Sequence, residues 1–174
     1  LGATGPLLGF GALWGVPYLH TALDISRPHA AGLASLTLIG WGIGAPTFGW
    51  LSDRLSRRRE PFLVGIVICS ASLMTIIHAL PQSHWAVGAL CFLVGFGGSS
   101  QIVNFAFAKA HNPPERTATA IGFINGIVTG AGALFQPAIG LALDLSWDGT
   151  IRDGVRIYSA DDYRPALSLL LIGL

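Results

Sequence analysis

Charged residues are scarce in this 174-residue sequence, and long stretches of it contain none. Asp, Glu, Lys and Arg make up 11% of the residues, whereas soluble domains usually carry about 25%. The stretches without any of the four are residues 1–23, 28–52, 61–108, 117–143 and 165–174. A membrane-spanning helix needs roughly 20 mostly apolar residues. These gaps exclude an ordinary soluble domain and predict an integral membrane protein.

Catalytic and metal-binding motifs are also missing. The sequence contains no GxSxG, no Walker loop and no metal-ligand spacing, so we expect neither an enzyme nor a cofactor. Cys69 and Cys91 both fall in apolar stretches, where we expect them to pack as small apolar side chains. The net charge of +1 gives no reason to expect a nucleic-acid partner.

The apolar stretches predict five complete membrane spans and the start of a sixth. The expected spans are residues 5–23, 29–51, 61–80, 85–108, 116–143 and 164–174. A polar turn cluster, Pro81-Gln82-Ser83-His84, separates the third span from the fourth. The sequence has no signal-peptide pattern and no initiator Met, and both ends lie in apolar runs. We therefore expect it to be part of a longer chain.

Basic residues in the short loops predict the orientation in the membrane. The loops at 52–60 and 109–116 contain six Lys and Arg residues. Short loops rich in these residues remain in the cytoplasm, so we expect both loops to be cytoplasmic. The long, mixed-charge loop that follows residue 143 then lies outside. It either shapes an outer vestibule or is a solvated connection.

A charged motif ends the second span. Here the carboxylate of Asp53 lies beside a group of arginines, which are Arg54, Arg57, Arg58 and Arg59. A carboxylate can accept hydrogen bonds from arginine or from a helix N-terminus, and such a contact can form in one conformation and break in another. An ordinary positively charged loop explains the same residues, and both interpretations remain open.

On this motif the sequence resembles the major facilitator superfamily, whose loop has the form G-x-L-x-D-R-x-G-R-R. The matching residues are Gly49, Leu51, Asp53, Arg54, Arg57 and Arg58, and the departure is Ser56 in place of glycine. The first half of such proteins commonly has an arginine in its fourth helix, and the fourth span here has none. Together with the departure at Ser56, this makes the sequence resemble the second half.

The resemblance implies an all-α integral membrane fold, the C-terminal six-helix half of a transporter (helices 7 to 12, the last truncated). It also implies an inner-membrane secondary transporter, a symporter or antiporter, that works by alternating access with its N-terminal half as partner. The motif residues that the resemblance assigns to gating are Gly49, Asp53, Arg54, Arg57 and Arg58.

The segment Asn112-Pro113-Pro114-Glu115 predicts the start of a helix. Asn112 suits the N-cap, Pro113 the first helical position and Glu115 the third, as in a capping box. Glu115 can instead pair with the arginines of the charged motif, which would add it to the gating residues.

Polar residues inside the spans are the candidates for contact with a small solute. Those on shared helix faces are Trp14 and Tyr18, Gln101 and Asn104, and Asn125, Thr129 and Gln136. Buried amides also serve as hydrogen-bonding links between helices, so each residue has two interpretations. The resemblance places the first, fourth and fifth spans beside a central cavity, which favours solute contact.

Apart from Arg116 and Arg164 at the first residue of the last two spans, the spans contain no charge, which has two consequences for transport. A coupling carboxylate must lie outside this sequence or be absent, and a neutral or zwitterionic solute fits this half better than a strongly charged one. A transport-inactive sensor or scaffold on the same fold is the alternative function. The double GxxxG pattern of Gly122, Gly126 and Gly130 predicts close helix packing.

Overall fold

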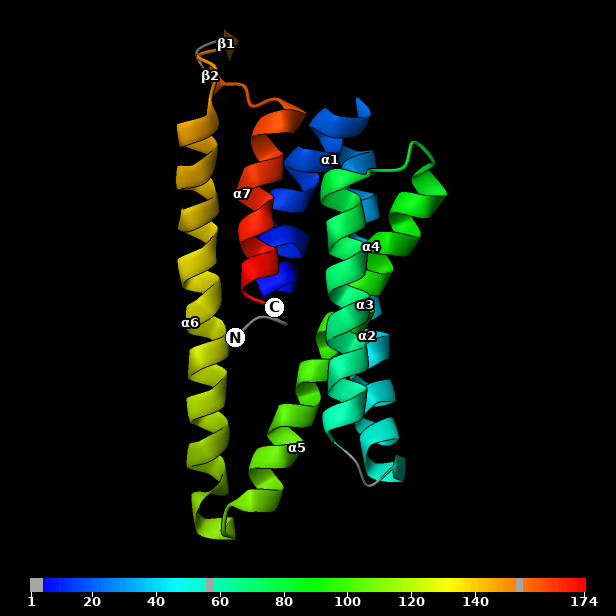
Figure 1. Cartoon of the computed structure of the whole chain (residues 1–174), viewed down its shortest axis with the longest axis vertical. Helices are drawn as coiled ribbons and strands as arrows, with labels where there is room; N and C mark the ends of the chain where they lie inside the picture. The colour runs from blue at the N-terminus through cyan, green and yellow to red at the C-terminus, as the bar shows by residue number, and fades with distance from the viewer. Residues whose placement is uncertain (1–4, 56–57, 153–154) are drawn as a thin grey trace.

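An apolar segment satisfies its backbone hydrogen bonds without water only as a helix or within a closed sheet, and this chain forms helices. The computed structural model describes residues 5–55, 58–152 and 155–174. In chain order the elements are η2 (Pro6–Trp14), α1 (Gly15–Leu23), α2 (Arg27–Leu55), α3 (Arg59–His78), α4 (His84–Gly98), η3 (Ser99–Gln101), α5 (Ile102–His111), α6 (Pro114–Ser146), β1 (Ile151–Arg152), β2 (Val155–Arg156) and α7 (Ala160–Ile172). Figure 1 shows them as an elongated bundle of upright helices, with the short β1–β2 hairpin at one end.

Two of the long helical segments change pitch along their length. η2 is a π-helix that continues directly into α1. The fourth segment passes from α4 through the 3₁₀ turn η3 into α5, at the sequence Gly97-Gly98-Ser99-Ser100. Small residues in succession weaken a regular helix and are common where a helix bends. In Figure 1, α4 and α5 together slant across the bundle toward the lower end of α6.

Helices α2 and α4 approach each other closely because glycines line their contact. A Cβ atom at Gly40 would overlap the carbonyl oxygen of Phe92, and one at Gly95 would overlap the carbonyl oxygen of Thr37. Gly44 meets Phe96 in the same way. The GxxxG spacing of Gly40 and Gly44 therefore serves packing within this chain, as expected for small residues between membrane helices.

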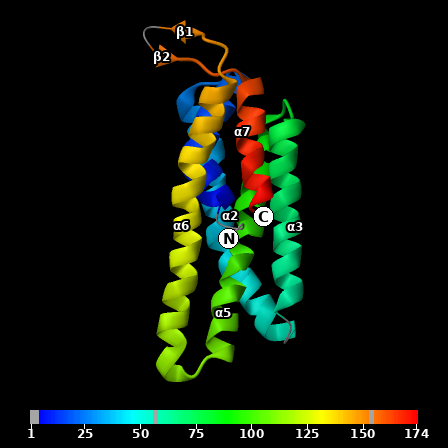
Figure 2. The same ribbon diagram turned by 60° about the vertical axis from the view of Figure 1, so that its left-hand side comes forward.

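The buried apolar core lies mainly where η2, α1, α3, α4 and α7 meet. Its largest fully buried side chains include Phe10, Leu73, Val87 and Leu167. Helix α7 contacts α1, α3 and α6, although it lies far from α1 and α3 in the sequence. In Figure 2 the lower parts of α5 and α6 extend below this core, with α5 beside α2.

The expected capping box at Asn112 is wrong. Asn112 has an extended backbone (φ −122°, ψ 144°) and ends α5, and its Nδ2 donates to the carbonyl oxygen of Ala108 at 2.8 Å. Pro113 is also extended, and α6 begins at Pro114 with no side-chain cap. A residue before proline avoids the helical conformation. Two successive prolines therefore hold both Asn112 and Pro113 outside the helix, and Glu115 lies one position earlier than expected.

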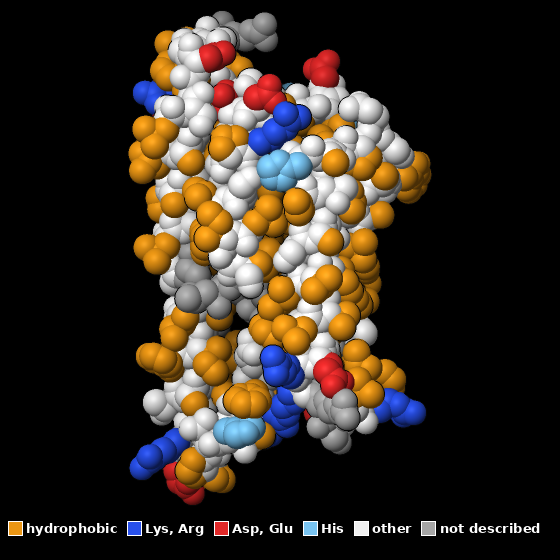
Figure 3. Space-filling view, in the orientation of Figure 1, with side chains coloured by type: hydrophobic (Ala, Val, Ile, Leu, Met, Phe, Trp, Pro, Cys, Tyr) orange, Lys and Arg blue, Asp and Glu red, His pale blue; other side chains and the backbone are white. Residues whose placement is uncertain are grey.

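The surface of the bundle is that of a membrane protein. Four helical segments of the described residues are long and apolar enough to cross a membrane: Arg27–Leu55, Arg59–His78, His84–His111 and Pro114–Ser146. Figure 3 shows that the coloured charged side chains gather at the two ends of the molecule, while apolar side chains cover the zone between them. This distribution matches a protein that spans the bilayer several times, with its charges in the two aqueous regions.

Candidate functional site: a polar face on α6 and a charged helix end

Most of the charged motif lies on a helix rather than in a loop. α2 continues past the apolar stretch to Leu55, so Gly49, Asp53 and Arg54 occupy its last two turns. The Arg54 guanidinium carbon lies 5.5 Å from the centre of the Trp50 ring, a distance suited to a cation–π contact. No glycine or proline follows Gly49 until Pro61, which explains why the helix extends beyond the apolar residues.

Arg58 joins the start of α3 to the fourth helical segment. Its Nη1 donates to the carbonyl oxygen of Ala106 in α5. Asp53 and Arg58 line a cavity of about 480 Å³ together with Lys109. The structure therefore places one carboxylate and two positively charged side chains around the same cavity. Arg57 lies outside the described residues.

Glu115 is exposed in the first turn of α6 and makes no ion pair among the described residues. An acid at this position favourably faces the positive end of the helix dipole. Its pairing with the arginines of the charged motif remains a prediction.

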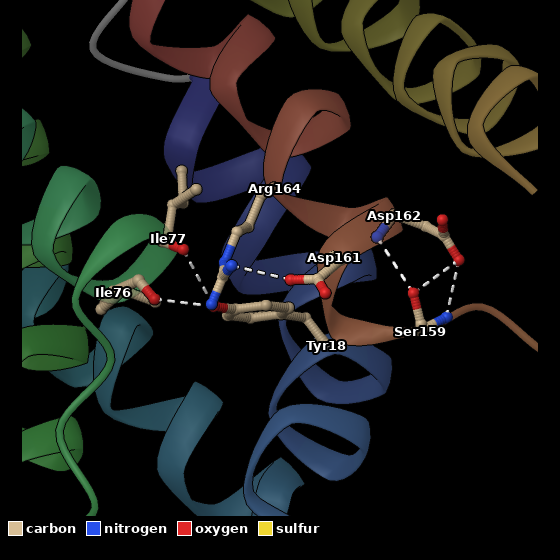
Figure 4. A network of polar contacts seen from close by, with 7 residues as sticks. All are labelled: Tyr18, Ile76, Ile77, Ser159, Asp161, Asp162 and Arg164. Atoms are coloured by element: carbon tan, nitrogen blue, oxygen red, sulfur yellow. Dashed lines mark hydrogen bonds and ion pairs between the residues drawn. The ribbon is translucent and has the colours of Figure 1, made fainter.

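Tyr18 and Gln136 hold helices of this chain together. Figure 4 shows the Tyr18 hydroxyl directed at the end of α3, where it donates to the carbonyl oxygen of Ile76 at 2.7 Å. Tyr18 is only 2% exposed. Gln136 Nε2 donates to the carbonyl oxygen of Leu8 at 3.1 Å and so connects α6 to η2. Both residues take the hydrogen-bonding role that the sequence left open beside solute contact.

The Gln101 side chain and the Nε1 atom of Trp14 are buried, whereas a solute-binding group would be exposed to a cavity. The Trp14 ring packs beside Gly140 of α6, and its buried Nε1 finds no hydrogen-bond acceptor within the described part of the chain. An orphan donor of this kind is costly in an apolar setting. Gln101, which is 8% exposed, lies in the 3₁₀ turn η3.

Asn104 borders two adjoining cavities between α3, α5 and α6. The first, of about 280 Å³, is lined by Arg58, Arg59, Phe62, Val103, Asn104 and Phe107. The second, of about 260 Å³, is lined by Asn104, Phe107, Ile124, Ile127 and Val128. The walls of both are largely apolar, and Asn104 supplies a polar amide to each. Phe62 and Phe107 were not candidates in the sequence, because apolar residues in a span give no signal of which ones line a cavity.

Helix α6 has faces of different character. At 100° per residue, Asn125, Thr129 and Gln136 lie within about 40° of one another. The strongly exposed apolar side chains lie roughly opposite, about 160–200° from Asn125, and they are Phe123, Leu134, Leu141 and Leu145. Asn125 and Thr129 are exposed as well. Gln136 on the same face contacts η2, so this polar face turns toward η2, whereas the strongly exposed apolar side chains lie on the opposite face.

Between these two faces of α6 runs a seam of glycines. At Gly122, Gly126 and Gly130, an added Cβ would meet no atom within 4 Å. The cavity-lining residues Ile124 and Val128 occupy the other flank, beside α5. The predicted close packing at these glycines therefore has no partner among the described residues, in contrast to Gly40 and Gly95.

Taken together, the apolar spans and the charged ends define a multi-pass helical membrane protein, with a cavity between α5 and α6. The chain matches the Major Facilitator Superfamily over residues 6–151 and belongs to it. This is a family of membrane transporters built from two six-helix halves, not a family of enzymes.

Three relatives carry transport names. A probable hexose phosphate transport protein of Chlamydia muridarum is 32% identical over 146 residues, which cover 78% of this chain and 31% of that protein. A cis,cis-muconate transport protein of Acinetobacter baylyi is 31% identical over 60% of this chain and 25% of its own length. A probable inositol transporter of Arabidopsis thaliana is 26% identical over 63% of this chain and 18% of its own length.

The matched part of this chain thus spans less than a third of each of these relatives. No solved structure matches it.

Proposed function

We propose that this chain is the C-terminal half of a secondary transporter of the inner membrane that moves a small polar solute by alternating access. The observation that supports this most is the layout of α6. One face carries exposed Asn125 and Thr129, the opposite face is apolar, and an open glycine seam lies between them. A polar face that is neither packed nor lipid-like is suited to line a water-filled cavity.

The open glycine seam supports a partner outside this sequence. Glycines allow two membrane helices to approach until their backbones touch, and Gly122, Gly126 and Gly130 are unoccupied. A helix of the N-terminal half would pack here and close the cavity from the opposite side. The polar face would then lie between the two halves, where solutes bind in transporters of this kind.

The charged end would act as the gate on the cytoplasmic side. The Arg58 contact with the carbonyl oxygen of Ala106 connects α5 to the start of α3, and Asp53 lies at the same opening. With the orientation predicted from the loop charges, this contact lies on the cytoplasmic side of the membrane. Rocking of the two halves would make and break contacts of Asp53 and the arginines with the other half.

Ion coupling belongs to the same proposal. The central parts of the membrane-spanning segments, residues 28–52, 61–108 and 117–143, carry no Asp, Glu, Lys or Arg, so a proton- or ion-binding carboxylate would be supplied by the other half. The names of the relatives suggest solutes to test: a hexose phosphate, inositol and cis,cis-muconate.

The full-length protein in liposomes with an internal pH dye provides the test. These three solutes, followed by amino acids, sugars and organic acids, are added with and without an imposed proton gradient. We expect solute-dependent proton movement for at least one class. Uptake of labelled solute without proton movement would support transport but contradict ion coupling. Silence of both readouts across the panel would support the transport-inactive alternative.

Two substitutions locate the solute site once a transported solute is known. Asn104→Ala and Asn125→Ala each remove one amide, and the loss of one hydrogen bond costs about 0.5–1.5 kcal/mol. We therefore expect each to raise KM several-fold. Leu134→Ala, on the opposite face of α6, is the matched control and should leave KM unchanged. Unchanged KM in both asparagine variants would move the site elsewhere.

A further inference from the structure

A small pocket lies at the end of the bundle opposite Asp53. It has a volume of about 220 Å³, and its lining includes His20 from α1, Arg27 from α2, Arg156 from β2, and the tyrosines Tyr158 and Tyr163. The five residues come from segments that are up to 143 positions apart (163 − 20) in the sequence. The fold therefore assembles this pocket, and no local motif marks it.

The lining of the pocket favours negative charge. It contains two guanidinium groups and one imidazole, and none of the described residues that line it is acidic. Among the described residues Arg27 forms no ion pair. Guanidinium groups recognise carboxylate and phosphate through paired, charge-assisted hydrogen bonds. Thr21 and Tyr158 add hydroxyl groups to the same walls.

A tight turn between α1 and α2 places His20 and Arg27 beside each other. Asp24 ends α1 in the left-handed conformation (φ 51°), which reverses the chain within a few residues. His20 Nδ1 lies 2.5 Å from the carbonyl oxygen of Ile25. Because a carbonyl only accepts hydrogen bonds, Nδ1 carries the proton and Nε2 remains available for another contact.

Arg156 is held in place from the other side of the pocket. Its Nη1 lies 2.8 Å from Asp144 Oδ1, and its guanidinium carbon lies 4.6 Å from the centre of the Trp147 ring. Tyr158 donates to the same Asp144 oxygen at 2.5 Å. The hydrogen bond to Asp144 raises the pKa of Arg156, so the guanidinium stays charged. Asp144 does not line the pocket, and it offsets only part of the positive charge.

We propose that this pocket binds a small anion bearing a carboxylate or phosphate group, and that it collects anionic solute before the solute reaches the central cavity. Anion binding does not depend on the proposed transport function. The collection of solute for the central cavity rests on that function. With the predicted orientation the pocket faces the outside of the cell, where a local excess of anion raises the rate of capture.

The test uses the purified full-length protein and calorimetric titration with inorganic phosphate, cis,cis-muconate and the neutral comparator myo-inositol. Arg27→Gln and Arg156→Gln should each weaken binding of both anions at least about tenfold, the effect of losing a charged hydrogen bond. Binding of both anions should also weaken at high salt, because exposed charges are screened. Any binding of myo-inositol should not respond to either variant.

A matched control and a variant of opposite sign sharpen the result. Arg164→Gln removes an exposed arginine at the same end, where it pairs with Asp161 outside the pocket, and should leave anion binding within about twofold of the wild type. Asp144→Asn removes the counter-charge of Arg156 and should tighten anion binding several-fold. A gain of this kind cannot result from misfolding.

The outcomes separate this inference from the proposed function. Phosphate binding that depends on Arg27 and Arg156, in a protein that moves no solute, would support the pocket and contradict transport. Solute transport with anion binding that is absent, or equal in the wild type and both arginine variants, would overturn the pocket alone. For a transported anion, both arginine variants should raise KM with little change in kcat.

Discussion

Tyr18 illustrates how single polar residues stabilise this bundle. Its ring is buried beside Phe10 and Tyr163, with ring centres 6.4 Å and 5.7 Å away. Its hydroxyl reaches the carbonyl oxygen of Ile76 at the end of α3. The last carbonyl groups of a helix have no partner within the helix, so this hydrogen bond satisfies one of them and links α1 to α3.

Tyr18→Phe should therefore destabilise the protein while preserving its packing. Loss of the hydrogen bond should lower the free energy of unfolding by roughly 0.5–1.5 kcal/mol, as measured by titration of the full-length protein with sodium dodecyl sulfate in mixed micelles. Tyr158→Phe is the control: it removes the hydrogen bond to Asp144, which is exposed to water, so it should change the free energy of unfolding by less than about 0.5 kcal/mol. Equal effects of the two variants would contradict a stabilising role for the Tyr18 hydroxyl.

Asp53 provides a test of gating at the same scale. Asp53→Asn retains the shape of the side chain and removes its charge, so it should reduce the transport rate of the full-length protein several-fold without reducing the amount inserted in the membrane. Asp161→Asn is the matched control, because it removes an exposed acid whose ion pair with Arg164 contributes little. An unchanged transport rate in Asp53→Asn would rule out the gating role.

At the scale of the helix, the glycines fall into two groups that the sequence does not distinguish. Gly40, Gly44 and Gly95 lie where α2 and α4 touch, whereas Gly122 and Gly126 face open space. All occur in apolar stretches, and four of the five belong to GxxxG patterns. The difference arises from which helices the chain itself supplies as neighbours.

Gly95→Ala and Gly126→Ala form a matched pair of substitutions. The added methyl at Gly95 would overlap the Thr37 carbonyl oxygen, and overpacking of this kind costs about 1–3 kcal/mol. We expect a clear loss of thermal stability for a fragment that spans this chain. Gly126→Ala should leave the stability of the fragment unchanged or slightly raised, since alanine favours the helix.

In the full-length protein the two variants should behave differently from the fragment. If the N-terminal half packs on the glycine seam, Gly126→Ala should impair assembly of the two halves or transport. Wild-type behaviour of Gly126→Ala in both settings would show that no helix packs closely there.

At the scale of the whole molecule, α6 is the least buried of the four long apolar segments among the described residues. Of the most apolar 18-residue stretch of α6, only 6% is buried, whereas 61% of the corresponding stretch of the segment His84–His111 is buried. Under the proposed function, the other half of the transporter and the lipid would each cover one face of this helix. The polar and apolar faces of α6 indicate which side each one occupies.

Cysteine labelling tests this division. Asn125→Cys should react with a water-soluble maleimide in the full-length protein, and a transported solute should slow the reaction. Leu134→Cys, on the opposite face, should react poorly because thiols in lipid are not ionised. The natural Cys69 and Cys91 are fully buried and should give a low background. Equal labelling of the two variants would contradict the assignment of the faces.

The sequence was sufficient for the membrane character, the helical fold and the family. Runs without charge have a direct physical meaning, because a charged side chain in the bilayer is costly. The candidate site was only partly accessible from the sequence. Helical spacing predicted one shared face for Asn125, Thr129 and Gln136, and solute contact by that face remains a prediction. The spacing could not show that Gln136 donates a hydrogen bond to the carbonyl oxygen of Leu8, while Asn125 and Thr129 remain exposed.

The start of α6 shows the same limit at a helix end. Asn112 and Glu115 have the spacing of a capping box, but the backbone preference of two prolines outweighed it and shifted the helix start. The two aromatic residues beside Asn104 carried no signal at all, since an apolar residue in a span looks the same whether it faces lipid, core or cavity.

The sequence by itself determined that the chain forms apolar helices, because hydrophobicity and backbone satisfaction act along a single segment. Only the tertiary structure decided which helix faces pair, which polar groups find partners, and that Arg27 and Arg156 meet at one pocket. These are distances between segments remote in the sequence, and they depend on the packing of all the helices at once.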